Sequence, residues 1–491
     1  MSITSTVFLF IFLPLAVGIY FILPKKNIIW RNIYLLILSL AFYAYGEALR
    51  LLLLVALIIA TYFLGIMASG KRNTKCGKWA VALTVIINIG ALFFYKYFSI
   101  IWQKVLPSFG ITELPAINFV LPLGLSFFCF SSISYVVDVY REKTPVQKNF
   151  LNLALYLSIF YKVTQGPITQ YNQFEKYLYE RKVTFDLFAN GVWRFIFGLG
   201  KKILLAGTLG IVASRAFDAD YNTLPVLVAW LGSFAYMLQL YFDFSGYSDM
   251  AIGLGKMFGF ETPENFDYPY FATSVTEYWQ KWHKTLGEWF RDYLYYPITL
   301  GPAIKLRKSL AKKHSRAYGK FMVNVLTLGI IWLATSVWHG SSINYLIWGL
   351  INGGVSLAEV YQKPHKDNKS FKFLGWCYTF FIALMVKTLT NVATVGEALH
   401  YYGAMFGFNG NALYSGEFLR LLLDYAPFLI VGTIASFPVF RWIKTKVENS
   451  NKKWLQISYT VVSSVFAIVV LVLSISYIER LGFSAFMYQK F

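Results

Sequence analysis

The chain has 491 residues, of which 57% are hydrophobic and only 14% are charged. Soluble domains carry about 25% charged residues, so this composition excludes an ordinary soluble enzyme, a disordered chain and a fibrous protein. It is typical of a protein that crosses a membrane several times. The formal charge of +21 is best explained by basic cytoplasmic loops, so we expect the lipid bilayer and not nucleic acid as the partner.

Apolar runs long enough to form membrane-spanning helices recur along the whole chain, since a span needs roughly 20 apolar residues. The first run, 4–23, has no basic segment before it and no small-residue cleavage site after it. We therefore interpret it as a retained span and not as a signal peptide. The other predicted spans lie near 32–46, 49–68, 79–97, 116–139, 187–215, 225–243, 322–338, 343–361, 372–388, 421–440 and 455–477.

One further apolar stretch, 150–166, is short and ends in Gln165-Gly166-Pro167. It fits a re-entrant segment better than a complete span. Lys and Arg residues concentrate in alternate turns between the first spans and again in 305–320 and 441–453. Because cytoplasmic loops are enriched in basic residues, this pattern predicts that the N-terminus and the C-terminal tail both lie outside the cytoplasm.

The segment 240–300 combines acidic and aromatic residues in a way that is unusual for a transporter. Asp243 lies beside an apolar run, where a carboxylate marks either a site or a structural polar network, and we favour structure. Ser274 and Glu277 form a capping-box pattern, and aromatic residues then recur at three- and four-residue steps. The spacing predicts one amphipathic helix over 274–293, lying at the membrane interface. His283 falls on its aromatic face, where a histidine is more often a packing residue than a catalytic one.

His339 follows the apolar run 321–338 and is succeeded by Gly340-Ser341-Ser342 and a second apolar helix. An ionisable residue at such a break in a membrane helix points to a functional site. The alternative, a histidine that caps a helix C-terminus, stays equally open at this point. An imidazole there is suited to general-base catalysis near neutral pH. We find no motif of a serine hydrolase, metalloprotease or ATPase, and the three scattered cysteines give no metal site.

These segments together resemble the membrane-bound O-acyltransferase (MBOAT) superfamily, and within it the alginate O-acetylase membrane subunit and related bacterial polysaccharide O-acetyltransferases. The similar segments are spread over most of the chain and are highly specific in combination. They are 126–140, 165–168, 241–253, 263–266, 279–283, 289–294 and 338–340. The resemblance implies an all-α polytopic fold, with about 10–12 transmembrane helices plus re-entrant and interfacial helices around a central tunnel.

We expect one membrane domain, 1–491, in which 1–140 holds N-terminal spans, 141–361 holds the catalytic core and 362–491 holds C-terminal spans. The resemblance also implies the activity: transfer of an acetyl group from cytoplasmic acetyl-CoA toward hydroxyls of an extracytoplasmic polysaccharide. It implies His339 as the general base and His283 as the second catalytic histidine, with no bound cofactor and no metal. Four residues are expected to line the substrate tunnel or to give polar support: Asp243, Ser245, Trp282 and Asn344.

The C-terminal residues 483–491 resemble the aromatic endings of the same group. They make Tyr488 a candidate acyl acceptor or relay, although an interfacial aromatic anchor is the favoured interpretation. Because a small pore cannot admit a polymer, we also expect an extracytoplasmic acetyltransferase partner. The expected location is the plasma membrane of a bacterial cell.

Two alternatives remain. The D-alanyl transfer protein of teichoic acid modification is similar, but that branch typically has Ala where this chain has Ser245 and is shorter. The other alternative is a transporter or channel for a small acylated species. Transporters often contain duplicated halves with paired broken helices, whereas this sequence has one convincing break, at His339. One departure from the family pattern, 160–165, leaves the path of the donor or acceptor open.

Overall fold

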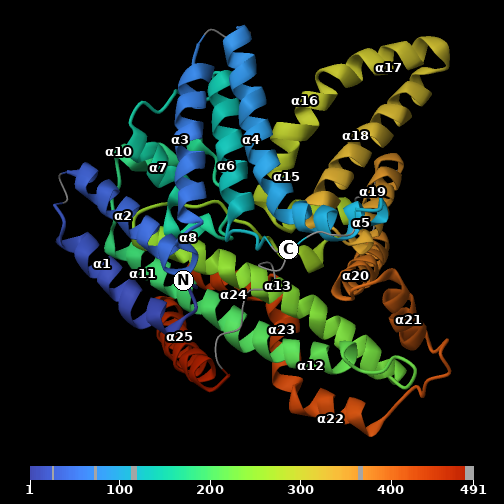
Figure 1. Cartoon of the computed structure of the whole chain (residues 1–491). Helices are drawn as coiled ribbons and strands as arrows, with labels where there is room; N and C mark the ends of the chain where they lie inside the picture. The colour runs from blue at the N-terminus through green and yellow to red at the C-terminus, as the bar shows by residue number, and fades with distance from the viewer. Residues whose placement is uncertain (25–26, 71–73, 112–114, 116–118, 363–368, 482–491) are drawn as a thin grey trace. The chain divides into compact units, whose positions relative to one another are not determined.

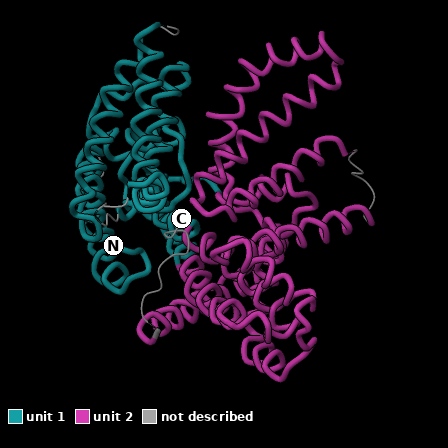
Figure 2. The backbone as a smooth tube through the Cα atoms, turned by 45° about the vertical axis from the view of Figure 1, so that its right-hand side comes forward, with its two compact units in different colours: residues 1–195, 248–264 teal, residues 196–247, 265–491 magenta. Residues whose placement is uncertain are grey.

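The computed structural model describes residues 1–24, 27–70, 74–111, 115, 119–362 and 369–481 (Figure 1). The described chain is helical and contains no strand. It divides into two compact units, drawn in different colours in Figure 2: unit 1 comprises 1–195 and 248–264, and unit 2 comprises 196–247 and 265–491. The prediction that 1–491 form a single domain stays a prediction.

The helices of unit 1 come from the N-terminal part of the chain. They are α1 (Leu13–Ile22), α2 (Ile28–Glu47), α3 (Leu51–Ala68), α4 (Lys75–Ile100), α5 (Leu106–Ser108), α6 (Leu125–Tyr140), α7 (Phe150–Ser158), α8 (Phe160–Val163), α9 (Tyr171–Phe174) and α10 (Lys176–Tyr179). Two further helices, α11 (Phe185–Gly200) and α13 (Val226–Met257), contribute residues to both units.

The remaining helices belong to unit 2. They are α12 (Gly207–Phe217), α14 (Val275–Lys281), α15 (Lys284–Phe290), α16 (Tyr296–Thr299), α17 (Pro302–Lys313), α18 (Arg316–His339), α19 (Ile343–Tyr361), α20 (Lys369–Asn391), α21 (Val395–Phe406), α22 (Gly416–Asp424), α23 (Ala426–Ala435), α24 (Val439–Glu448) and α25 (Lys453–Leu481). Short π-helical or 3₁₀ turns at 8–12, 101–105, 201–206, 269–271 and 291–295 adjoin these helices or connect them.

Eight helical segments among the described residues are long and apolar enough to cross a membrane, or nine if the pair α22 and α23, bent by 63°, forms one span. This confirms the predicted all-α polytopic class. The predicted run 4–23 forms a shorter apolar helix, Phe8–Ile22, and the described part of the run 116–139 forms α6 from Leu125 onward. The figure of 10–12 spans and the central tunnel stay predictions.

The stretch 150–166, which was predicted to be re-entrant, forms two short helices with an interruption between them. Helix α7 ends at Ser158, Ile159 takes an extended ψ of 125°, and α8 continues for four residues before the Gly166-Pro167 turn. A Cβ on Gly166 would lie 2.4 Å from Cα of Lys162, so only glycine fits this close approach. The sequence did not predict the interruption at Ile159, and the re-entrant topology of the stretch stays a prediction.

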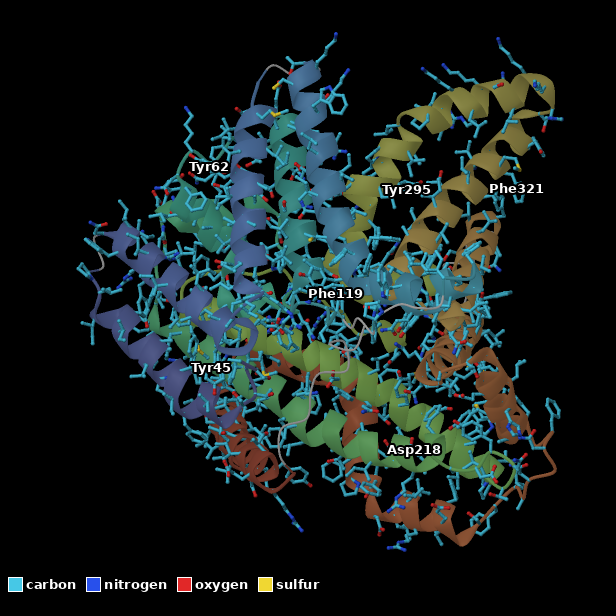
Figure 3. All side chains as sticks on the ribbon, viewed as in Figure 1. Tyr45, Tyr62, Phe119, Asp218, Tyr295 and Phe321 are labelled. Carbon is cyan, nitrogen blue, oxygen red and sulfur yellow. The ribbon has the colours of Figure 1, made fainter. Side chains whose placement is uncertain are left out.

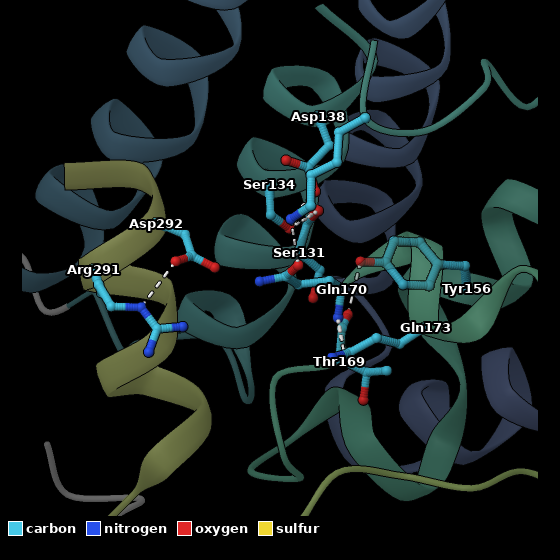
Figure 4. A network of polar contacts seen from close by, with 10 residues as sticks. Ser131, Ser134, Asp138, Tyr156, Thr169, Gln170, Gln173, Arg291 and Asp292 are labelled. Atoms are coloured by element: carbon cyan, nitrogen blue, oxygen red, sulfur yellow. Dashed lines mark hydrogen bonds and ion pairs between the residues drawn. The ribbon is translucent and has the colours of Figure 1, made fainter. Parts of the chain in front are cut away.

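Unit 1 is held by an aromatic core and by a polar network. Phe8, Phe42 and Phe160 pack with ring centroids 5.8–6.4 Å apart. Figure 4 shows the network around α6: the Ser134 hydroxyl donates to the Ser131 carbonyl, and the Tyr156 hydroxyl donates to the Thr169 carbonyl over 2.9 Å. These bonds satisfy polar groups that would otherwise be costly to bury in an apolar setting.

Unit 2 has its core on α13, whose buried aromatic and aliphatic side chains pack with α12, α20 and α21. Glycines let α11 and α13 approach closely within each unit. A Cβ on Gly253 would lie 2.6 Å from the Gly191 carbonyl oxygen in unit 1, and one on Gly246 would lie 2.7 Å from the Gly198 carbonyl oxygen in unit 2. Small residues at such positions are a common basis of helix packing in membranes.

Candidate functional site

His339 is the last residue of α18, where the sequence predicted a break between two apolar helices. Gly340 and the following two serines separate it from α19, whose first turn is capped by the Ser342 hydroxyl. The His339 side chain is buried among aromatic rings: its centroid lies 4.6 Å from Trp338 and 4.9 Å from Trp348, and its ring stacks on Tyr345 at 5.8 Å. Burial with a defined ring orientation is the setting that positions a catalytic imidazole.

His283 interrupts the segment that was predicted to be one continuous helix over 274–293, and that prediction was wrong. The segment forms α14 and α15, with His283 between them in the left-handed region at φ 47° and ψ 52°. The cause is tertiary. The Asp267 N–H donates to the Lys281 carbonyl over 3.0 Å, and the Lys284 N–H donates to the Asn265 carbonyl over 2.8 Å, so the preceding loop replaces helical bonds at the break. The Ser274 cap predicted at the start of α14 is confirmed.

The Asn265 side chain fixes the tautomer of His283. Its Oδ1 accepts from the Thr285 N–H and hydroxyl, which identifies that atom as oxygen, and it lies 3.0 Å from Nδ1 of His283. The imidazole therefore donates through Nδ1 and has its lone pair on Nε2. Burial lowers the pKa of His283 to about 3, because the imidazolium would lose its hydration. His283 is thus neutral at physiological pH.

Trp338 lies near both predicted histidines. Its ring centroid is 6.4 Å from that of His283 and 4.6 Å from that of His339. Phe244 of α13 packs edge-on against His283 at 4.7 Å. The structure thus brings both histidines, which are far apart in the sequence, into one aromatic environment within unit 2.

Trp282 and Asn344 lie beside this environment in different roles. The Trp282 ring is buried, and the Lys387 amine nitrogen lies over its face, 3.6 Å from the ring centroid. The Asn344 amide donates to the carbonyls of Leu389 and Val392 over 3.1 and 2.9 Å, so it ties the start of α19 to the end of α20. These bonds fit the structural part of the predicted role of Asn344.

Helix α14 is held in place by α19. The two carboxylate oxygens of Glu359 accept from the N–H groups of Val275 and Thr276 over 2.7 and 2.8 Å, which satisfies two free donors of the first turn. The Trp279 indole donates to Asn352 over 2.9 Å. Together these bonds fix the segment that ends at His283.

Asp243 and Ser245 flank Phe244 on α13. Asp243 forms a buried ion pair with Lys202, and both line a cleft of about 720 Å³ that also includes Arg215, Gln239 and Asp218. Asp218 lies at the end of α12 (Figure 3). The pair supports the structural interpretation of Asp243, because a buried carboxylate needs a cationic partner. The Ser245 hydroxyl is buried and has no hydrogen-bond partner among the described residues.

Tyr488 lies outside the described residues. Among the residues that the structure covers, no group of three or more His, Cys, Asp or Glu side chains is placed to hold a metal ion. Several residues of the site were not predicted from the sequence: Asn265, Trp338, Trp348, Glu359 and Lys387. Lys387 could have been predicted from the sequence, since an ionisable residue inside the apolar run 372–388 indicates a functional site.

Comparison with known proteins identifies the family of the chain. The model of the MBOAT, membrane-bound O-acyltransferase family, matches residues 38–396. The chain belongs to this family. It is therefore an O-acyltransferase and a multi-pass membrane protein, which confirms the predicted enzyme class.

The relatives differ in their similarity to the chain. The probable alginate O-acetylase AlgI of Pseudomonas syringae pv. tomato is 36% identical, over 92% of this chain and 84% of the relative. The peptidoglycan O-acetyltransferase of Helicobacter pylori is 29% identical, over 86% and 83%. The teichoic acid D-alanyltransferase of Bacillus subtilis is more distant, at 25% identity over 53% and 64%. The resemblance to polysaccharide O-acetylases is thus confirmed.

Proposed function

We propose that the protein transfers an acetyl group from cytoplasmic acetyl-CoA toward hydroxyl groups of an extracytoplasmic polysaccharide, with His339 as the general base. The observation that carries this proposal is that His339 and His283 both lie near Trp338 in a buried aromatic site. The similarity to an alginate O-acetylase over most of both chains supports the acetyl group and the polysaccharide.

The proposed step at His339 needs one proton acceptor and no covalent intermediate on either histidine. His339 takes the proton of the acceptor hydroxyl, whose oxygen then attacks the thioester carbonyl carbon. The carbon–sulfur bond breaks, and the proton passes to the departing CoA thiolate, so that the imidazole returns to its neutral form. The aromatic rings around His339 exclude water, which would otherwise compete with the acceptor.

His283 has a different part in this proposal. Because its Nδ1 is engaged by Asn265 and its pKa is about 3, it stays neutral and presents Nε2 as a hydrogen-bond acceptor. It is suited to orienting a donor or acceptor group and not to donating a proton. Asp243 and Ser245 give polar support on α13, and Trp282 gives support next to His283.

The final acceptor lies beyond the membrane in this scheme. We propose an extracytoplasmic acetyltransferase partner that completes transfer to the polymer, with Tyr488 as a candidate relay if the C-terminal tail lies outside. The bacterial plasma membrane is the proposed location, and no bound cofactor is required.

The proposal is tested with purified protein and acetyl-CoA labelled in the acetyl group. Transfer to oligosaccharides, hydrolysis and label on the protein are each measured by mass spectrometry for wild type and for His339→Ala. Since general-base catalysis contributes about 10²–10⁴-fold, we expect His339→Ala to lose activity by that factor. The control is His314→Ala, at an exposed histidine at the end of α17.

Two results would contradict the proposal. Equal activity of wild type and His339→Ala would remove His339 as the base. A wild type that uses D-alanyl thioesters and not acetyl-CoA would replace the acetyl group by the D-alanyl group. Label mapped to Tyr488 in wild type alone would support the relay, whereas turnover that persists in Tyr488→Phe would show that the Tyr488 hydroxyl is dispensable.

A further inference from the structure

The cleft of about 720 Å³ in unit 2 has no part in the proposed reaction. Its walls come from α12, α13 and α22, and among the described residues neither candidate histidine lines it. Gln239 and Asp243, four residues apart, share the face of α13 that borders the cleft. Small-molecule sites have volumes of roughly 300–1,000 Å³, so the cleft is large enough to hold a ligand of its own.

The mouth of this cleft carries three exposed charged side chains. Arg215 and Asp218 lie one turn apart at the end of α12, and Glu417 lies in the first turn of α22. Across the described ranges, no ion pair or side-chain hydrogen bond involves any of the three. The mouth therefore offers one cation and two carboxylates to a ligand.

The inner part of the cleft has a different character. Its deep end is closed by the buried ion pair of Lys202 and Asp243, whose charges neutralise each other. Between this pair and the mouth, the α12 side of the wall consists of small or apolar residues: Ala206, Gly207, Gly210 and Ile211. Twelve residues separate the first of these from Asp218, which is about 18 Å of helix at 1.5 Å per residue. The cleft is thus a groove with a charged mouth and a largely apolar middle.

The mouth lies where three candidate membrane segments end or begin. The segment Phe185–Phe217 ends with α12, the segment Val226–Met257 is α13, and α22 starts the bent pair. The Leu227 N–H donates to the Leu413 carbonyl over 3.1 Å, so the chain before α22 lies beside the start of α13. Tyr414 in that chain is exposed, as aromatic side chains at a membrane interface are. The charged mouth is therefore expected at the level of the lipid head groups, with the apolar groove below it.

We propose that this cleft binds a phospholipid with a zwitterionic ethanolamine head group. The Arg215 guanidinium donates to the phosphate oxygens, and the carboxylates of Asp218 and Glu417 accept from the ammonium. One acyl chain lies along the apolar middle of the groove. The site is separate from the two histidines, so the inference does not depend on the proposed reaction.

The charges at the mouth distinguish this head group from two others. A glycerol head group brings a phosphate and no cation, so the carboxylates of Asp218 and Glu417 face another negative charge. A choline head group has the positive charge, but its nitrogen carries no hydrogen to donate. A soluble zwitterion of the same kind satisfies the mouth and leaves the apolar groove unfilled.

The test is native mass spectrometry of the full-length protein in detergent, after its co-purified lipid has been removed. Phospholipids with ethanolamine, glycerol and choline head groups and identical acyl chains are offered together in equal amounts. The ratios of the bound lipids are measured within one preparation, so the fraction of correctly folded protein cancels. Glycerophosphoethanolamine, which has the head group and no acyl chain, is offered separately.

We expect wild type to retain the ethanolamine lipid over each of the other two by roughly two- to fivefold, the effect of a partly exposed ion pair. Asp218→Asn and Glu417→Gln should each lower the preference over the glycerol lipid, and the double variant should abolish it. Asp424→Asn is the matched control and should keep the wild-type ratio, since Asp424 is an exposed carboxylate of α22 that does not line the cleft.

A second variant tests the groove and not the charges. Gly207 lines the groove, and a Cβ added there would meet only the Lys202 carbonyl oxygen, at 3.9 Å, so a larger side chain fits the backbone. Gly207→Leu should lower the retention of the ethanolamine lipid severalfold. Its melting temperature should not fall, because leucine favours a helix more than glycine does.

Four results would overturn the inference. Equal retention of the three lipids by wild type removes the head-group selectivity. A preference that persists unchanged in the Asp218→Asn, Glu417→Gln double variant places the lipid elsewhere on the protein, and so does unchanged retention in Gly207→Leu. Binding of glycerophosphoethanolamine as tight as that of the intact lipid makes the ligand a soluble zwitterion and not a phospholipid.

Discussion

At the residue scale, His283 shows how burial sets the charge state of the site. The folded pKa is about 3, whereas an unperturbed histidine titrates near 6.5. Between these values the unfolded chain binds a proton that the folded chain does not. Unfolding is therefore favoured as pH falls below about 6.5, and the full penalty is reached near the folded pKa.

This difference predicts how stability depends on pH. We expect the wild-type melting temperature to fall between about pH 7.5 and about pH 5, and His283→Gln to fall less, because glutamine takes up no proton. The measurement is thermal unfolding in one detergent at both pH values. His314→Gln, at an exposed histidine, should keep the wild-type slope, and an equally steep loss in His283→Gln would contradict the assigned burial of the charge.

The two histidines also show what the sequence could predict and what it could not. His339 follows a long apolar run and precedes Gly340 and two serines, and these local signals placed the helix end correctly. His283 lies in a segment with helical spacing and no glycine or proline at the break. Its left-handed backbone is stabilised by the loop around Asn265, a tertiary effect that local spacing does not encode.

At the element scale, the close approach of α11 and α13 depends on glycine. Gly253 of α13 faces the Gly191 carbonyl and the Phe195 backbone, where an added Cβ would lie 2.6–2.7 Å from backbone atoms. Backbone cannot move aside as a flexible side chain can, so even one methyl forces the helices apart. This packing positions the part of α13 that belongs to unit 1.

Gly253→Ala is therefore expected to destabilise the protein by about 1–3 kcal/mol through overpacking. The matched control is Gly90→Ala in α4, where nothing lies within 4 Å of the new Cβ. There, alanine should be neutral or stabilising by roughly 0.5–1 kcal/mol, because glycine weakens a helix interior. Thermal unfolding of both variants and of wild type gives the comparison, and equal effects of the two substitutions would contradict the close contact.

Also at this scale, the hydropathy pattern located the long helices but not the way in which they are joined. Glu359 of α19 holds α14 in place, and Asn344 bonds to the end of α20. Each of these contacts joins residues more than 40 positions apart. Neither pair forms a recognisable motif. The helices could be read from their apolar runs, whereas the contacts that assemble the candidate site needed the structure.

At the scale of the whole molecule, the proposed reaction needs a direction across the membrane. Acetyl-CoA is cytoplasmic and the polysaccharide is not, so the donor and acceptor must reach the site from opposite sides. The basic helix α17 carries five Lys and Arg residues and no acid: Lys305, Arg307, Lys308, Lys312 and Lys313. The positive-inside rule predicts that α17 is cytoplasmic. The chain is predicted to cross the membrane three times after α17, outward through α18, inward through α19 and outward again through α20. The segment between α21 and α22 should therefore lie outside.

This topology is tested with two single-cysteine variants in a background in which Cys76, Cys129 and Cys377 are replaced by serine. Ser309→Cys lies on exposed α17, and Ala412→Cys lies on the exposed segment before α22. In intact cells, a membrane-impermeant maleimide should label Ala412→Cys, whereas Ser309→Cys should react only after the membrane is permeabilised. The reverse pattern would place α17 outside the cell. The side of the protein that carries α17 would then not face the cytoplasm, where acetyl-CoA is found, and the proposed orientation would be wrong. Labelling of both positions in intact cells would show that α18–α20 do not cross the membrane as predicted, and transfer from inside to outside would lose its structural basis.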